Sequence, residues 1–218
     1  MRVTLIGMTA PSNGHKSAED LIVYMARVSN PNNQDNTQGN DKLIRYLIKN
    51  QHWSPFEMVS LVMEINTTRD IARQILRHRS FSFQEFSQRY ADPTKELSFE
   101  LRNARLQDYK NRQKSIETDD IELQNKWNLM QQALINNAEH AYNWAIQNGI
   151  AKEQARAVLP EGNTQSRLYM NGTLRSWIHY CQLRMENGTQ KEHAEIANEC
   201  WDIIAAQFPN VATALEQQ

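Results

Sequence analysis

The sequence predicts an α+β fold: a small, mostly antiparallel sheet flanked by several long helices, with a second half that is largely helical. Two short stretches in the first 70 residues alternate apolar and polar side chains, as half-buried strands do. Longer apolar patterns recur at helical spacing, and most of them lie after residue 119. A chain of 218 residues can bury one sizeable core, so we expect a single domain over residues 1–218.

The elements of the first half follow from these two periodicities. In chain order the patterns predict a strand at 3–5, a helix at 18–28, an Asn/Gln-rich loop at 30–40, a helix at 42–49, a strand at 59–65, a helix at 69–79 and a loop at 80–93. Thr68 precedes the last of these helices and is a candidate for its N-cap.

Helical spacing dominates the second half. The patterns predict helices at 119–147, 151–159, 173–185 and 191–208, with Gly149, Pro160 and Pro209 as stop signals. The first helix carries one apolar stripe, made of Trp127, Met130, Leu134, Ala138, Ala141 and Ala145. We expect this stripe to pack in the core or at a subunit interface.

Composition excludes several classes of protein. With 22% charged residues and a formal net charge of −1, the chain is neither disordered nor basic enough to indicate a nucleic-acid partner. No apolar stretch approaches the length of a membrane span, and the N-terminus lacks a secretory pattern, so we expect a cytoplasmic protein. His15, His140 and His193 are scattered, and we predict no metal site.

Arginines form the most unusual pattern. Arg69, Arg73 and Arg77 fall on one face of the helix predicted at 69–79, where like charges repel and Asp70 is the only acid close in sequence. Either acids from elsewhere in the fold pair with them, or an external anion does. Ser87 and Arg89 add a hydroxyl and a guanidinium suited to phosphate, which favours the anion.

The seven glycines form neither a dinucleotide-binding fingerprint nor a P-loop. A nucleotide would therefore be held by side chains and helix termini.

The segment Arg77-His78-Arg79, followed by Ser87, resembles the signature of the flavin-dependent thymidylate synthases. The resemblance extends in order along most of the chain, through Ala26–Ser29, His52–Glu57, Ala72–Gln74, Ala155–Pro160 and Leu174–His179 as far as Arg184. An ordered set of motifs is far more specific than any one of them.

The resemblance implies roles for individual residues. FAD would contact Ser54, Arg77, His78, Arg79, Glu85, Thr173, Arg175 and His179. The dUMP site would be lined by Gln74, Arg77, Glu85, Phe86, Ser87, Gln88, Arg89, Arg156 and Arg184. Arg184 would face the pyrimidine as the catalytic residue, and His52 would lie near flavin and folate. Thr173 departs from the family, which often has Asn there.

The implied reaction is reductive methylation of dUMP to dTMP, with methylenetetrahydrofolate as one-carbon donor, FAD as redox cofactor and NADPH as reductant. Neither Cys181 nor Cys200 lies in a pattern that activates a thiolate, so we expect no enzyme nucleophile. The family also implies a homotetramer with shared active sites. Two alternatives stay open: a nucleotide-binding module without catalysis, and a nucleic-acid-binding protein that uses the arginine column.

Overall fold

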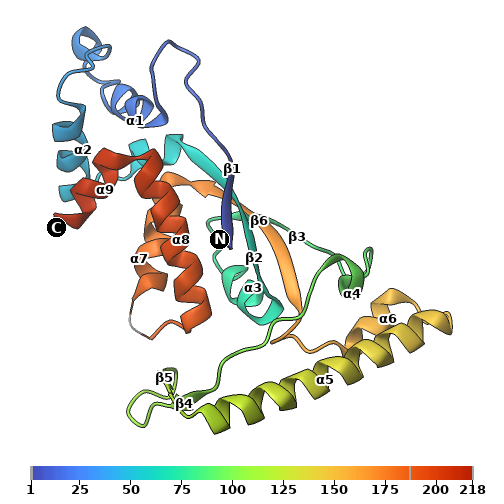
Figure 1. Ribbon diagram of the computed structural model, residues 1–218. Coiled ribbons are helices and arrows are strands. Elements are labelled where there is room, and N and C mark those ends of the chain that lie inside the picture. Colours follow the sequence, from blue (N-terminus) through green and yellow to red (C-terminus); the bar gives the residue numbers. More distant parts are fainter. Residues whose placement is uncertain (1, 187, 218) are drawn as a thin grey trace.

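The computed structural model describes residues 2–186 and 188–217, which fold around a four-stranded antiparallel sheet (Figure 1). The strands are β1 Val3–Met8, β2 Ser60–Thr68, β3 Ser82–Glu85 and β6 Gln165–Thr173, in the order β1-β2-β6-β3. A separate hairpin joins β4 Arg105–Gln107 to β5 Ser115–Glu117. The predicted α+β class with a small antiparallel sheet is therefore confirmed.

Helices make up most of the rest. They are α1 Ala18–Ala26, η1 Pro31–Asn33, α2 Asn40–Lys49, η2 Ser54–Met58, α3 Arg69–Ile75, α4 Pro93–Glu96, α5 Ile121–Gln147, α6 Lys152–Ala155, η3 Arg156–Val158, α7 Leu174–Met185, α8 Lys191–Gln207 and α9 Pro209–Glu216. Polar caps begin several of them: Ser17 accepts from the amide of Asp20, and Asp120 from that of Leu123. Gly149, at φ 78°, ends α5 as predicted.

The pairing of β2 with β6 forms the centre of the sheet. It runs without interruption from Ser60 opposite Thr173 to Thr68 opposite Gln165. Leu61, Met63 and Ile65 point from β2 into the main core and have no exposed surface. Side chains from α1, α2, α3 and α7 to α9 complete this core, so the elements that carry the predicted site motifs are anchored in it.

The hairpin strands β4 and β5 and two strands of the main sheet were not predicted. The segment predicted as a loop at 80–93 contains β3, and β6 interrupts the helical second half. The buried face of β6 includes Ser166 and Gly172 beside Leu168 and Met170, so its apolar alternation covers only two positions. That pattern is too short to distinguish from a loop.

Two helix predictions also need correction. The helix predicted at 69–79 ends at Ile75, and the one at 151–159 is two short turns, α6 and η3. Thr68 does occupy the N-cap position of α3, but its hydroxyl donates to the Asp70 carboxylate at 2.6 Å and makes no capping hydrogen bond.

The apolar stripe of α5 is only partly covered. Ala138 and Ala145 are buried, whereas Trp127, Met130 and Leu134 are exposed. Figure 1 shows the reason: α5 extends past the end of the sheet, and it packs mainly on α6 and η3 in a small separate cluster. The division of residues 1–218 into domains stays a prediction. Along the described parts of the chain, no helix combines the length and apolar character that crossing a membrane requires.

Gly172 allows a close aromatic contact beside the signature motif. A Cβ built on Gly172 would lie 2.3 Å from the ring of Phe81, which packs on Trp177 with ring centroids 4.9 Å apart. The same ring lies 6.0 Å from Tyr180 and 6.5 Å from His78, so it has little room to move.

Gly172→Ala should therefore lower the free energy of unfolding by about 1–3 kcal/mol, because Phe81 must leave its packed position. Gly162→Ala is the matched control, since a Cβ there meets no atom within 4 Å and the backbone is not left-handed. Chemical denaturation of both variants measures the difference. Equal stability would contradict the contact.

Candidate active site

The Arg77-His78-Arg79 motif lies in the turn between α3 and β3, where Arg184 from the last turn of α7 reaches it. Nε of Arg184 donates to Nε2 of His78 at 2.9 Å, across 106 residues of sequence. Because an arginine can only donate, Nε2 of His78 is unprotonated. Burial, with the charges of Arg184 and Arg77, lowers the pKa of His78 to about 4. The imidazole is therefore neutral at physiological pH.

The structure separates the arginine column into two kinds. Arg73 pairs with Glu161 at 2.7 Å and Arg69 with Glu85 at 3.5 Å, so internal acids account for both. Arg77 and Arg79 lie beyond the end of α3, exposed, and no carboxylate among the described residues is within ion-pair distance of either. The external-anion interpretation therefore stays a hypothesis for these two arginines, and internal acids replace it for Arg69 and Arg73.

Glu85 through Arg89 follow the motif along β3 and into the next turn. Glu85 accepts a hydrogen bond from the Ser166 hydroxyl at 2.7 Å, and the amide of half-buried Phe86 donates to the carbonyl of Arg167 at 2.8 Å. Gln88 is buried, and its Nε2 has no partner among the described atoms. A buried amide without a partner is costly, which suits a ligand that completes it.

Ser87 and Arg89 line a hollow of about 440 Å³ against α6. Lys152, Glu153, Tyr90 and Ala151 form its other walls. Arg89 contacts Glu153 at 3.2 Å, while Arg156, half-buried, begins η3 directly after α6. Arg89, Lys152 and the Ser87 hydroxyl thus line this hollow together with one acid, Glu153, and the first three can bind phosphate.

A second group of predicted residues lies where η2 meets the start of α7. Thr173 caps α7 by accepting from the amide of Ser176 at 3.3 Å, and Arg175 pairs with Glu57 at 2.7 Å. Ser54 is exposed at the start of η2. His179 packs edge-on to Trp53, with ring centroids 4.9 Å apart, and burial followed by the Arg175 charge lowers its pKa.

Trp53 and His179 also form one wall of a larger hollow, of about 710 Å³. The side chains around it are Arg45, Ile48, Lys49, Gln51, Gln182, Ala214 and Gln217. His52 is exposed nearby, edge-on to Tyr46 at 5.9 Å between ring centroids.

The predicted site residues therefore lie in separate groups. Arg184 joins the signature motif, and Arg175 and His179 join η2, whereas Ser87 and Arg89 line a hollow against α6. Each of the two hollows described above is lined by only some of the predicted site residues.

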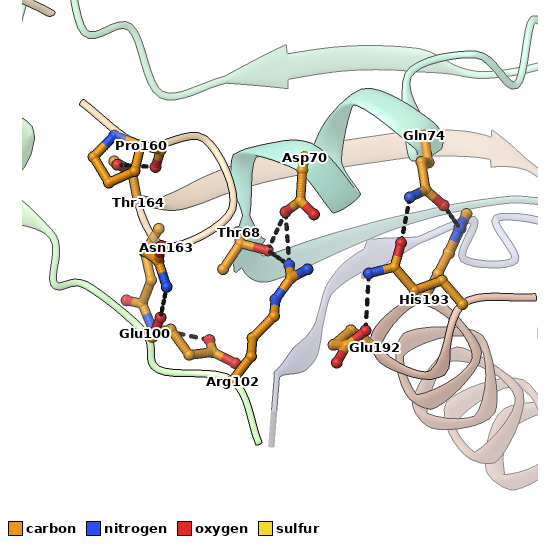
Figure 2. Close-up of polar contacts among 12 residues, drawn as sticks. Thr68, Asp70, Gln74, Glu100, Arg102, Pro160, Asn163, Thr164, Glu192 and His193 are labelled. Atoms are coloured by element: carbon orange, nitrogen blue, oxygen red, sulfur yellow. Dashed lines mark hydrogen bonds and ion pairs between the residues drawn. The ribbon is translucent and has the colours of Figure 1, made fainter. Parts of the chain in front are cut away.

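Buried residues that the sequence analysis missed lie behind the motif. Figure 2 shows Gln74 beside His193, whose Nδ1 is 3.2 Å from Oε1 of Gln74. Nε2 of His193 is 3.1 Å from the hydroxyl of Tyr180, and the ring of Tyr180 packs edge-on against His78 at 4.9 Å. The spacing of Tyr180 and Arg184 on one helix could have indicated Tyr180. No local pattern indicates His193.

The side chains of the site fit a ligand with a phosphate group and a heterocyclic ring better than they fit a metal ion. Exposed Arg77 and Arg79 can bind phosphate, and the neutral rings of His78 and His179 can contact a heterocycle. Within residues 2–186 and 188–217, no three His, Cys, Asp or Glu side chains gather as metal ligands would.

Comparison with known proteins identifies the family. Residues 12–210 match the family model described as thymidylate synthase complementing protein. The chain is 48% identical to the flavin-dependent thymidylate synthase of Synechocystis sp., covering 99% of this chain and 100% of that one. It is 47% identical to a probable flavin-dependent thymidylate synthase of Paramecium bursaria Chlorella virus 1, covering 99% of both.

A solved structure agrees with this result. It is a UMP/dUMP methylase from Streptomyces cacaoi bound with 5-Br dUMP, and it superposes with a TM-score of 0.79 at 26% identity over 99% of this chain and 94% of that one. Fold, motif order and full-length similarity all lead to one assignment. The chain belongs to the thymidylate synthase complementing protein family and, with its relatives, to the flavin-dependent thymidylate synthases.

Proposed function

We propose that the protein converts dUMP to dTMP by reductive methylation, with methylenetetrahydrofolate as one-carbon donor, FAD as bound redox cofactor and NADPH as reductant. The hydrogen bond from Arg184 to His78 carries this proposal. It joins the arginine expected to face the pyrimidine to the motif expected to hold the flavin. The names of the relatives, and the 5-Br dUMP bound to the structural neighbour, support the same pair of ligands.

FAD would be held by residues from both halves of the chain. We assign its contacts to Ser54, Arg77, His78, Arg79, Glu85, Thr173, Arg175 and His179. The hydroxyl of Thr173 already accepts from the backbone of α7, so the flavin contact here uses its remaining hydrogen-bonding capacity. When bound, FAD supplies the redox chemistry, and these side chains bind and orient it.

The dUMP site would use the hollow beside α6 and the turn that leads to it. We assign Gln74, Arg77, Glu85, Phe86, Ser87, Gln88, Arg89, Arg156 and Arg184 to it. Ser87 and Arg89 fit the phosphate, and the unpaired Nε2 of buried Gln88 fits an acceptor on the nucleotide. Glu85 already accepts from Ser166, which fixes its carboxylate in place.

Arg184 is placed to stabilise charge on the pyrimidine. Its Nε donates to neutral His78, and the two terminal amino groups of the guanidinium, which make no hydrogen bond to residues 2–186 or 188–217, would face the ring. A fixed cation directed at a ring that becomes anionic lowers the barrier, because it needs no reorganisation during the reaction.

The mechanism would require no cysteine nucleophile. Cys181 and Cys200 are both buried free thiols, and burial raises the pKa of each well above its ordinary value. A protonated thiol inside the core neither reaches a substrate nor attacks it.

A homotetramer would complete the site. The predicted residues lie in separate groups within one copy, and Trp127, Met130 and Leu134 on α5 expose apolar surface that one copy leaves uncovered. Neighbouring copies could cover this surface and bring the groups together.

The absorbance spectrum of purified protein tests the proposal most directly. We expect oxidised-flavin bands that shift when dUMP is added, and dTMP formation when folate and NADPH follow. UMP, offered in parallel, tests the second substrate named for the structural neighbour. A flavin-bound protein that forms no methylated product would support the binding module. A protein that binds no FAD and binds random DNA in a salt-sensitive way would support nucleic-acid binding.

Arg184→Gln should reduce kcat for dTMP formation by roughly a hundredfold or more, the usual effect of losing a fixed charge at a developing anion. Arg112→Gln is the matched control, because Arg112 is exposed in the turn between β4 and β5. Steady-state kinetics on flavin-loaded protein compare the two. A variant with normal kcat would remove Arg184 from the chemistry.

A variant with both Cys181→Ala and Cys200→Ala should retain dTMP formation, with some loss of stability from two small cavities. Its turnover is measured alongside circular dichroism and flavin content. Complete loss of turnover in folded, flavin-loaded protein would overturn the mechanism without a thiolate.

A further inference from the structure

A chain of hydrogen-bonded side chains runs from β4 to the signature motif. Arg105 pairs with Glu192 at 2.5 Å, and Nε2 of Gln190 donates to Glu192 at 3.0 Å. Nε2 of Gln74 donates to Oε1 of Gln190 at 2.8 Å. From Gln74 the chain continues through His193 to Tyr180, the contacts described above. Figure 2 shows Glu192, Gln74 and His193 within this arrangement.

The direction of the chain is set at Glu192. An ionised carboxylate only accepts, so Gln190 must donate its amide N–H to it and offer its carbonyl oxygen to Gln74. Gln74 must then donate to Gln190, which directs its own carbonyl oxygen at His193. His193 consequently carries its proton on Nδ1 and accepts at Nε2 from the Tyr180 hydroxyl.

Charge and burial hold this direction. The Arg105 and Glu192 side chains are each only 12% exposed. Burial opposes ionisation of Glu192, yet the hydrogen bonds from Arg105 and Gln190 hold its pKa below the ordinary value. At the other end, burial lowers the pKa of His193 to about 3 and raises that of Tyr180, so both rings stay neutral. The pKa shifts of Glu192, His193 and Tyr180 thus all keep these groups from titrating near neutral pH.

This direction fixes the orientation of the Gln74 amide. Gln74 is half-buried and belongs to the proposed dUMP site. Its carbonyl oxygen is occupied by His193, and one of its two amide N–H bonds by Gln190. The remaining N–H is the group left for a ligand. The phosphate and both uracil carbonyls of dUMP are acceptors, so this is the group that the nucleotide needs.

We propose that the Arg105–Glu192 ion pair is a positioning device that fixes the orientation of the Gln74 amide, so that Gln74 presents an N–H to dUMP. The inference rests on the proposed function, and it adds residues of β4 and α8 that touch no substrate themselves. Its basis is the directed chain of hydrogen bonds from Glu192 through Gln190 to Gln74.

Glu192→Gln tests the device with almost no change in shape. A glutamine can donate or accept, so the chain loses its fixed direction and Gln74 presents its N–H only part of the time. We expect the Kd for dUMP, measured by calorimetry on the flavin-loaded protein, and the KM for dUMP to rise about threefold to tenfold, as for one lost hydrogen bond. The kcat at saturating dUMP should stay within about twofold.

Two further variants support the comparison. Glu195→Gln makes the same charge change at an exposed position on the same helix and should leave the Kd unchanged. Gln190→Met interrupts the chain while the Arg105–Glu192 ion pair remains, and should raise the Kd as Glu192→Gln does. It gives an independent test if the buried arginine makes Glu192→Gln unstable.

The possible results distinguish failure of the proposed function from failure of the positioning role. Wild-type protein that forms no dTMP and shows no flavin response to dUMP would overturn the proposed function itself. Active wild-type protein together with folded Glu192→Gln or Gln190→Met protein of unchanged Kd would overturn the positioning role alone. A variant with a lower melting temperature and an unchanged Kd would show that these hydrogen bonds serve stability only. That result would also overturn the positioning role.

Discussion

The pairing of β2 with β6 brings together the segments that carry two groups of predicted site residues, one at η2 and one at the signature motif. β2 begins just after η2 and ends at α3, whereas β6 ends at α7, and the two strands run antiparallel in continuous register. Ser60 is therefore opposite Thr173, which brings η2 beside the start of α7 and lets Glu57 reach Arg175. At the other end α3 is held beside the first residues of β6. The same register, with α7 running back across the sheet, allows Arg184 to meet His78.

Sequence patterns predicted those elements whose periodicity is contained within a single segment. The alternation over 59–65 identified β2, and the order of motifs identified the family before any contact was known. The sequence did not predict β6, because Ser166 and Gly172 occupy half of its buried face. Neither residue is apolar enough to indicate burial, which depends on the neighbouring elements. His193 escaped for a similar reason, since its partners Gln74 and Tyr180 come from other helices. Hydrogen bonds between side chains of different helices produce no periodic pattern in a sequence.

The long helix α5 shows how a correct pattern can give an incomplete prediction. Its apolar stripe was identified, but the expectation of burial holds within this chain only near Ala138 and Ala145. Helical periodicity identifies the apolar face of a helix, but it does not identify which segment or subunit packs on that face. The exposed stripe and the divided site are two separate observations, and a symmetric assembly would account for both.

The arginines near the signature motif show how structural cations differ from those kept for a ligand. Arg69 and Arg73 are paired with acids from other segments, Glu85 and Glu161. Arg77 and Arg79 follow them by a few residues, yet they face solvent with no acid in reach among the described residues. If these four arginines served stability alone, the same surface would be expected to supply an acid to each of them. The internal pairing stops where α3 ends, and under the proposed function the anionic ligand would lie against the turn that contains His78.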